Sequence, residues 1–167
     1  HEKVVEILIK NGANVNSMTT SGRTPLHNAC ANEHMKLVEI LIKNGANVNS
    51  MMTDGRTPLY IACSNGHEKV VEILIKNGAN VNSMTTDGET PLYIACLNGH
   101  REIWRIVAKH GGTIPENLIS KLKEMMKPEE FIEVNQIIEF KRFMTSVKKG
   151  DIGEVRMMIR MNERRKD

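Results

Sequence analysis

A six-residue motif recurs along the chain at a fixed interval of 33 residues. It reads GRTPLH at residues 22–27, GRTPLY at 55–60 and GETPLY at 88–93. The cysteines keep the same interval, at Cys30, Cys63 and Cys96. A unit of this length cannot bury its apolar face alone, so neighbouring units must stack to form a continuous core. The interval therefore predicts that the units stack as successive layers along one axis. Only 4% of the residues are aromatic, which suits thin layers better than one deep core.

The unit at residues 54–86 illustrates the local structure that each repeat predicts. Gly55 suits a tight turn because glycine tolerates positive φ. Thr57 can cap a short first helix, and Pro58 can occupy its first position, where a missing N–H costs nothing. Residues 67–76 then carry a broad apolar stripe, which predicts a second helix buried on several sides. The segment that follows leads out as one arm of a hairpin.

A period of 33 residues built on Thr-Pro-Leu-His resembles the ankyrin repeat. The resemblance implies an all-α ankyrin-repeat solenoid, made of helix–turn–helix units joined by β-hairpin loops, with a helical C-terminal extension. It also implies a non-catalytic module that binds another protein on its concave hairpin and first-helix surface. The predicted organisation is an array over 1–112 and an extension or cap over 113–167. Within the array we expect a partial repeat at 1–20, repeats at 21–53 and 54–86, and a divergent last repeat at 87–112.

The C-terminal extension lacks the Thr-Pro-Leu motif and leaves two interpretations open. Thr113 and Glu116 have the spacing of a capping box, and Pro128 can start a further helix. Residues 150–151 suggest a turn, with Asp151 and Glu154 spaced as a second cap. In the first interpretation these helices form a cap, with a degenerate ankyrin repeat at 139–162. In the second, the extension loosely resembles an F-box, a helical module that recruits ubiquitin-ligase components. That resemblance depends on the order of Ile114, Pro115, Leu118, Pro128, Phe131, Val134, Lys141, Arg142 and Phe143.

In the ankyrin family, partners are usually bound by the hairpin tips and the exposed edge of the first helix. The matching positions in this chain are Met18, Thr20, Ser21, Arg23, Ala31, Asn32, Met51, Thr53, Asp54, Arg56, Ser64, Asn65, Met84, Thr86, Asp87, Glu89, Leu97 and Asn98. The three methionines of this set form a polarizable row that suits an adaptable protein surface; alternatively, they pack hairpin against hairpin. The two arginines are candidate polar anchors.

The remaining periodic residues are predicted to have structural roles. Equivalent residues in stacked helices lie about 8–10 Å apart, whereas a disulfide requires Cα atoms within about 7 Å. The cysteines are therefore expected to be small apolar fillers, typical of an intracellular, cytoplasmic protein. One histidine per layer cannot converge on a metal ion, so His34, His67 and His100 are expected to pack locally. We expect Trp104 to cover the last apolar layer. The residue after the Leu of each motif is His27, Tyr60 or Tyr93. Each of these side chains should bond back to the Thr of its own motif.

Charge and motif content argue against other functions. The net charge is only +3, although residues 141–167 hold nine Lys and Arg against four Asp and Glu. Nucleic-acid binding is not favoured, because no aromatic stacking residue lies among the basic residues Arg156, Arg160, Arg164, Arg165 and Lys166. No phosphate-binding loop or catalytic constellation stands outside the repeat, so we predict no enzyme activity, cofactor, metal or small-molecule substrate.

No apolar run is long enough to span a membrane, and no signal peptide is visible. We expect no membrane partner and a monomeric protein. Because His1 lies inside a repeat, we also expect the chain to continue a longer parent protein.

Overall fold

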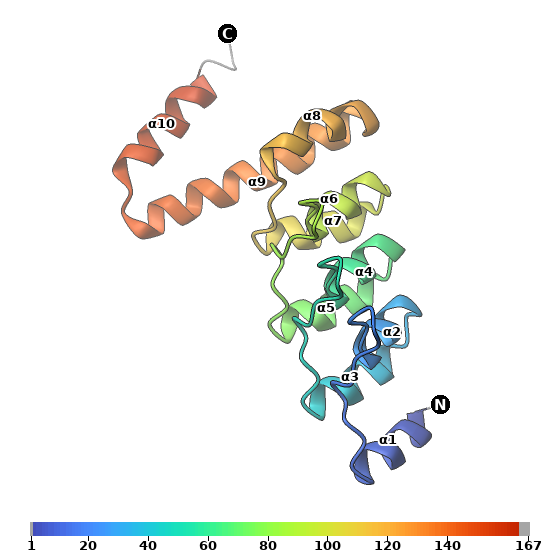
Figure 1. Ribbon diagram of the computed structural model, residues 1–167. Coiled ribbons are helices and arrows are strands. Elements are labelled where there is room, and N and C mark those ends of the chain that lie inside the picture. Colours follow the sequence, from blue (N-terminus) through green and yellow to red (C-terminus); the bar gives the residue numbers. More distant parts are fainter. Residues whose placement is uncertain (1, 164–167) are drawn as a thin grey trace.

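The computed structural model describes residues 2–163, and these form an elongated stack of helices (Figure 1). His1 and residues 164–167 lie outside the described part, and the predicted basic residues Arg164, Arg165 and Lys166 are among these excluded residues. The helices of the described part are α1 Glu2–Lys10, α2 Pro25–Ala31, α3 Met35–Lys43, α4 Pro58–Asn65, α5 Glu68–Lys76, α6 Pro91–Leu97, α7 Arg101–Lys109, α8 Glu116–Met125, α9 Pro128–Lys149 and α10 Ile152–Glu163.

The helices of the repeats form two rows (Figure 1). The first helices α2, α4 and α6 stack on one another, and the second helices α1, α3, α5 and α7 form the other row. Each first helix also packs against the second helix that follows it, so the apolar core runs between the rows. The described residues contain no strand, and the all-α solenoid predicted from the repeats is confirmed.

Each first helix begins where the repeated motif predicts. Thr24, Thr57 and Thr90 are the N-caps, and each side-chain oxygen accepts a hydrogen bond from the backbone N–H three residues later. The following proline occupies the first helical turn. A cap of this kind stabilises a helix by about 1 kcal/mol. The helix α4 ends at Gly66, whose φ of +83° is strained for any other residue.

The hairpin loops are tight turns that contact the next repeat. The N–H of Met52 donates to the carbonyl of Arg56 at 2.9 Å and closes one turn. The N–H of Thr53 then donates to the carbonyl of Ser21 at 2.9 Å, which joins this turn to the preceding one. The same bond recurs one repeat later, from Thr86 to Asp54. The loops predicted as β-hairpins are therefore linked through their backbones, although they form no strand within the described residues.

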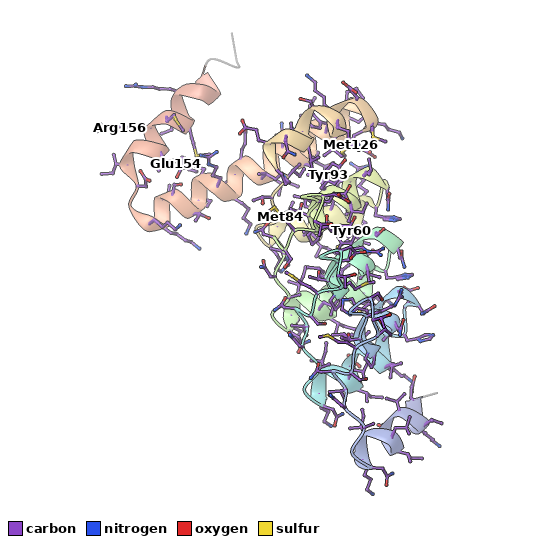
Figure 2. The ribbon with its side chains drawn as sticks, viewed as in Figure 1. Tyr60, Met84, Tyr93, Met126, Glu154 and Arg156 are labelled. Atoms are coloured by element: carbon purple, nitrogen blue, oxygen red, sulfur yellow. The ribbon has the colours of Figure 1, made fainter. Side chains whose placement is uncertain are left out.

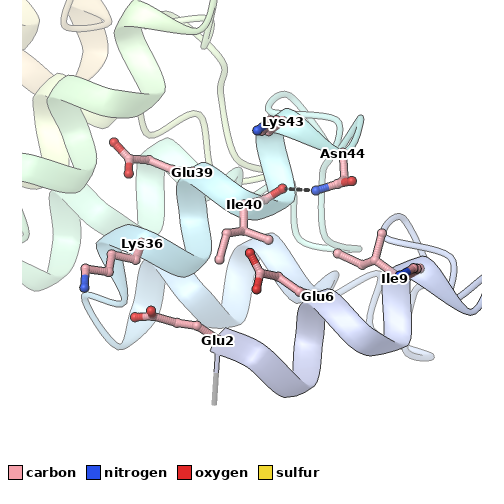
Figure 3. A pocket seen from close by; sticks show the side chains of 9 residues that line it. Glu2, Glu6, Ile9, Lys36, Glu39, Ile40, Lys43 and Asn44 are labelled. Carbon is pink, nitrogen blue, oxygen red and sulfur yellow. Dashed lines mark hydrogen bonds between the residues drawn. The ribbon is translucent and has the colours of Figure 1, made fainter.

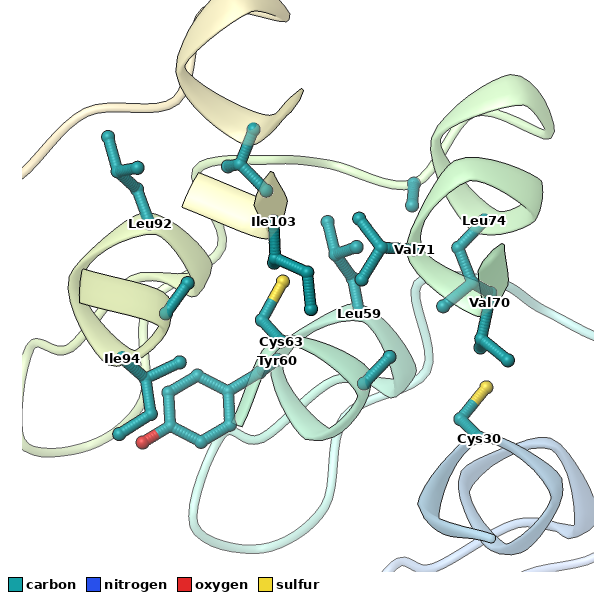
Figure 4. Packing of buried hydrophobic residues seen from close by; sticks show 14 of the residues in the cluster. Cys30, Leu59, Tyr60, Cys63, Val70, Val71, Leu74, Leu92, Ile94 and Ile103 are labelled. Atoms are coloured by element: carbon teal, nitrogen blue, oxygen red, sulfur yellow. The ribbon is translucent and has the colours of Figure 1, made fainter. Parts of the chain in front are cut away.

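The core is aliphatic and includes the periodic cysteines (Figure 4). The three cysteines are free thiols and fully or almost fully buried, which confirms their role as apolar fillers. Burial raises the pKa of Cys30 and of Cys96 to about 12. Figure 4 shows the thiol of Cys63 directed toward Ile103 of the next repeat. The cysteines therefore contribute to the packing of one layer against the next.

Asparagine side chains also join each layer to the next. Asn49 donates from Nδ2 to the carbonyl of Gly78 at 3.1 Å, and its Oδ1 accepts from the N–H of Asn80 at 2.7 Å. Asn16 and Asn82 make the same pair of bonds one repeat earlier and one repeat later. These bonds satisfy loop backbone groups that no helix or strand pairs.

The C-terminal extension continues the stack without the repeated motif. Helix α8 packs on α6, and α9 packs on α7, so α8 and the start of α9 form a further layer. Leu122, Met126 and Val134 of this layer are buried, and Met126 lies close to the last repeat in Figure 2. Trp104 beneath it is fully buried, as predicted. The carboxylate of Glu133 pairs with two arginines of α7, Arg101 at 2.8 Å and Arg105 at 2.5 Å. The sequence did not indicate this contact.

The capping predictions in the extension had different outcomes. The prediction that Thr113 caps α8 is wrong: the N-cap is Pro115 and makes no side-chain cap. Thr113 instead donates from its N–H and hydroxyl to Asn82 Oδ1, at 2.8 and 2.9 Å, which fixes the chain as it leaves the array. The cap predicted at Asp151 is confirmed, since its Oδ1 accepts from the N–H of Glu154 at 3.0 Å. The proposed degenerate repeat at 139–162 comprises the end of the 22-residue α9 and then α10.

Candidate partner-binding surface

The predicted partner-binding residues occupy the hairpin turns and the edges of α2, α4 and α6. None of the eighteen side chains is buried; each is exposed or half-buried. They fall into three equivalent sets because the first helices and the hairpins stack in register. We call this set of eighteen residues the hairpin surface.

Methionine side chains stand out along the hairpin surface. Met18, Met51 and Met84 are 60%, 50% and 56% exposed, whereas the adjacent Met52 is only 8% exposed. Met84 is labelled in Figure 2. Among the two alternatives for this row, the exposure favours an open surface over packing between hairpins. Large contiguous apolar patches mark interaction sites, whereas single exposed apolar side chains are ordinary on a protein surface.

Backbone contacts, rather than these methionines, bring the hairpins together. Gly55 has a φ of +80°, and a Cβ built on it would lie 2.8 Å from Cα of Thr85 in the next hairpin. Gly22 has the same kind of contact, at 3.0 Å from Cα of Met52. At Gly88 a Cβ would meet nothing within 4 Å, because no further hairpin follows. The close approach fixes the relative positions of the first three turns.

The predicted polar anchors have partners within the protein. Arg56 forms an ion pair with Asp54 at 2.6 Å, and the hydrogen bond from Arg56 lowers the pKa of that carboxyl. Arg23 donates from Nε to Asn28 Oδ1 at 2.5 Å. Both arginines remain partly accessible. Their guanidinium groups are therefore oriented before any partner binds, which reduces the entropy lost on association.

The edges of the first helices are tied to one another. Asn65 Nδ2 and His67 Nε2 both donate to the carbonyl of Ala31, at 3.0 and 3.1 Å. The same two bonds recur one repeat later, to the carbonyl of Ser64 from Asn98 and His100. The predicted packing role of these two histidines is confirmed, and two of the predicted surface residues, Asn65 and Asn98, also stabilise the stack.

The residue after Leu behaves differently in each repeat. His27 bonds back to Thr24, at 2.8 Å between Nδ1 and Oγ1, as predicted, and its Nε2 also reaches the carbonyl of Arg56 at 3.2 Å. The prediction is wrong for Tyr60, whose hydroxyl donates to Glu89 of the next repeat at 2.5 Å. Burial and this carboxylate raise the pKa of Tyr60. The hydroxyl of Tyr93 is buried and has no hydrogen-bond partner among the described residues.

A separate cavity of about 750 Å³ lies between the second helices α1 and α3, away from the hairpin surface (Figure 3). Its charged lining balances three glutamates, Glu2, Glu6 and Glu39, against three lysines, Lys10, Lys36 and Lys43. Residues 2–163 contain no cluster of three or more His, Cys, Asp or Glu placed to hold a metal ion. No helix in the same range is both long and apolar enough to cross a membrane.

The stacked helix pairs define a helical-repeat protein, and comparison with known families specifies which kind. A family model described as ankyrin repeats (3 copies) matches residues 1–85. A second model, ankyrin repeats (many copies), matches residues 66–105. The chain belongs to the ankyrin-repeat family. The comparison with curated proteins found no match. Ankyrin repeats indicate a protein–protein interaction module, and proteins of this family are typically non-catalytic.

Proposed function

We propose that the hairpin surface is the site at which this protein binds a partner protein, without catalysis. The observation that carries the proposal is the row of exposed methionines at equivalent positions of three ordered hairpins. A rigid, preorganised surface of this kind loses little entropy on binding. In this proposal residues 1–112 form the binding array on a concave face, and residues 113–167 cap it. Buried free thiols are consistent with a monomer in a reducing cytoplasm.

A comparison of two variants tests this proposal. In the first variant, Met18, Met51 and Met84 are all replaced by serine. In the second, Met125→Ser removes a methionine that is equally exposed, at 60%, but lies on α8. Affinity capture of proteins from a cell extract, followed by mass spectrometry, compares both with the wild type. A partner should be recovered with the wild type and the Met125 variant but lost from the triple variant, and equal recovery with all three would refute the proposal.

The alternative function is an adaptor whose C-terminal helices recruit ubiquitin-ligase components. Four of the nine residues that suggest this function are committed to packing. Val134 is fully buried, and Ile114, Leu118 and Phe131 pack against the core of the array. Co-precipitation of the whole chain with a purified linker subunit of a ubiquitin ligase distinguishes the two functions. Stoichiometric recovery would favour the adaptor.

A further inference from the structure

The second half of α9 and the whole of α10 project sideways from the stack (Figure 1). Among the described helices, α9 is the one that packs closely against α10. A groove of about 470 Å³ lies between the two helices. Its walls are lined by Phe140 and Phe143 on α9, by Met158 and Ile159 on α10, and, nearer the start of α9, by Gln136 and Glu139. One side of this projecting helix pair is therefore largely apolar.

Helical spacing extends the apolar side beyond the groove. Met144 and Val147 follow Phe140 by four and seven residues, so the three side chains share one face of α9. Ile152 precedes Ile159 by seven residues, so these two share one face of α10. All five side chains are between 37% and 66% exposed. We call these five residues the apolar face.

Polar contacts hold the two helices in place. The carboxylate of Glu154 on α10 accepts from Arg142 Nε at 2.7 Å and from the hydroxyl of Ser146, both on α9. Gly150, with a φ of +71°, and the Asp151 cap make the turn between the helices. The apolar face is therefore assembled from two helices before anything binds to it.

Basic side chains flank the apolar face on its outer edges. Lys141 and Lys148 each follow a residue of the apolar face, Phe140 and Val147, by one position, so they lie on the neighbouring strip of α9. Both lysines are exposed. Arg156 lies on the outer side of α10, directed away from α9 in Figure 2. None of these three basic groups forms an ion pair with another described residue.

The projecting segment also differs from the array in net charge. Residues 141–160 hold six basic and two acidic residues, whereas residues 1–140 hold 14 Lys and Arg against 16 Asp and Glu. The two acids of the segment accept hydrogen bonds within it, Glu154 from Arg142 and Asp151 from the N–H of Glu154. An anionic surface would therefore attract this segment and not the array.

We propose that the apolar face binds the surface of an anionic lipid bilayer, with α9 and α10 lying in the plane of the interface. Helices with basic residues beside an apolar face bind membranes in this way. The apolar side chains would enter the boundary between headgroups and acyl chains, and the flanking basic groups would approach anionic headgroups. The sequence-based expectation of no membrane partner concerned segments that span a bilayer, and an interfacial helix needs no such segment. This binding is additional to the proposed binding of a partner protein.

Charge makes two other occupants less suitable. An acidic amphipathic helix would lie in the groove, where the one charged lining residue is Glu139, which has the same sign of charge as that helix. A second copy of this chain would bring its own Lys141 and Lys148 to the contact. A flat anionic surface can contact both helices and the basic groups at their outer edges together.

The test is flotation of the full chain with two kinds of vesicle. One kind contains phosphatidylcholine alone, and the other contains phosphatidylcholine and phosphatidylserine in a three-to-one ratio. The apparent partition coefficient should be at least about tenfold higher for the mixed vesicles, because each lysine near an anionic surface contributes about fivefold. It should fall as salt is added, since exposed charges are screened. No binding to either kind of vesicle, or equal binding to both, would overturn the proposal.

Two pairs of variants assign the binding to this surface. The double variant Lys141→Glu with Lys148→Glu should weaken binding to mixed vesicles at least about twentyfold, whereas the same charge change at the exposed Lys121 and Lys123 of α8 should have a much smaller effect.

The second pair removes apolar side chains. Met144→Ser with Val147→Ser should weaken binding at least about tenfold, whereas Met51→Ser with Met84→Ser, on the hairpin surface, should leave it unchanged. Circular dichroism checks that every variant is folded. Variants of the apolar face or its lysines that bind like the wild type would contradict the proposal.

Two further measurements address the other occupants. Fluorescence polarisation with a labelled 18-residue helical peptide, carrying a leucine stripe edged by glutamates, tests an acidic protein helix. Sedimentation over a range of concentrations tests a second copy. Peptide binding or self-association that Met144→Ser with Val147→Ser abolishes would assign the apolar face to that occupant and overturn the proposal. The expected results are no peptide binding and a monomer at all concentrations. Failure of the membrane proposal leaves the hairpin surface untouched, because the test of that surface uses a different measurement, protein capture.

Discussion

The contact between successive hairpins can be measured by placing a methyl group in it. Gly55→Ala introduces a Cβ at a φ of +80°, which costs about 1–2 kcal/mol for an L-residue in the left-handed region. The same Cβ would lie 2.8 Å from Cα of Thr85 and 3.0 Å from the carbonyl oxygen of Met84. These are backbone atoms that cannot rotate away, so overpacking adds about 1–3 kcal/mol. The expected loss in the free energy of unfolding is therefore about 2–5 kcal/mol.

Gly88 provides a matched control for this prediction. Its φ is +77°, but a Cβ there would meet nothing within 4 Å. Gly88→Ala should therefore cost only the conformational term, about 1–2 kcal/mol. Gly22→Ala, with its nearest contact at 3.0 Å, should fall between the two. Urea unfolding, monitored by circular dichroism, gives the free energies if the slope with denaturant is unchanged. Equal losses at Gly55 and Gly88 would show that the hairpins do not pack as described.

Three further predictions concern buried polar groups. Tyr60→Phe should lower the free energy of unfolding by about 1–2 kcal/mol, because Glu89 loses its hydrogen bond, whereas Tyr93→Phe should be neutral or stabilising in the same urea titration. Burial lowers the pKa of His27 from 6.5, so this side chain binds a proton more readily in the unfolded chain than in the folded one. The contribution of His27 to stability should be full above about pH 6.5 and should fall as the pH drops below that value. His27→Tyr should flatten this pH profile. The three thiols should resist an aromatic disulfide reagent at pH 8 while the protein is folded and should all react in denaturant, because burial raises their pKa values.

Much of the array could be predicted from the sequence because its signals are local. The Thr cap and the Pro that follows it are adjacent in the chain, and both act where they were predicted. The burial of Cys63 follows from its place on the same short helix. Three interactions were missed because each joins residues 28 or more positions apart: Tyr60 with Glu89, and Glu133 with Arg101 and Arg105. Hydrophobic period and capping rules say nothing about such pairs.

For the candidate binding surface, the sequence predicted which residues are accessible but not which contacts they make. The repeat fixes which positions lie on the hairpins and on the helix edges, and none of the eighteen is buried. The internal partners of Arg23 and Arg56, which orient both guanidinium groups, required the structure. The groove between α9 and α10 was not predicted, because it depends on the angle between two helices that no repeated motif specifies.

The helices α1 and α5 separate what sequence determines from what tertiary structure decides. Both read EKVVEILIK, and both are nine-residue helices. In α5, Val70 and Leu74 are completely buried, whereas the equivalent residues of α1, Val4 and Leu8, are 59% and 53% exposed. The sequence determines the helix because its hydrogen bonds and side-chain spacing are internal to the segment. Burial depends on the neighbouring helices. Helix α5 packs against α4 and lies between α3 and α7, whereas among the described residues α3 is the one helix that packs closely against α1. The layer made by α8 and α9 shows the converse, since it stacks on the last repeat without the Thr-Pro-Leu motif, through apolar surface and the ion pairs of Glu133 with α7.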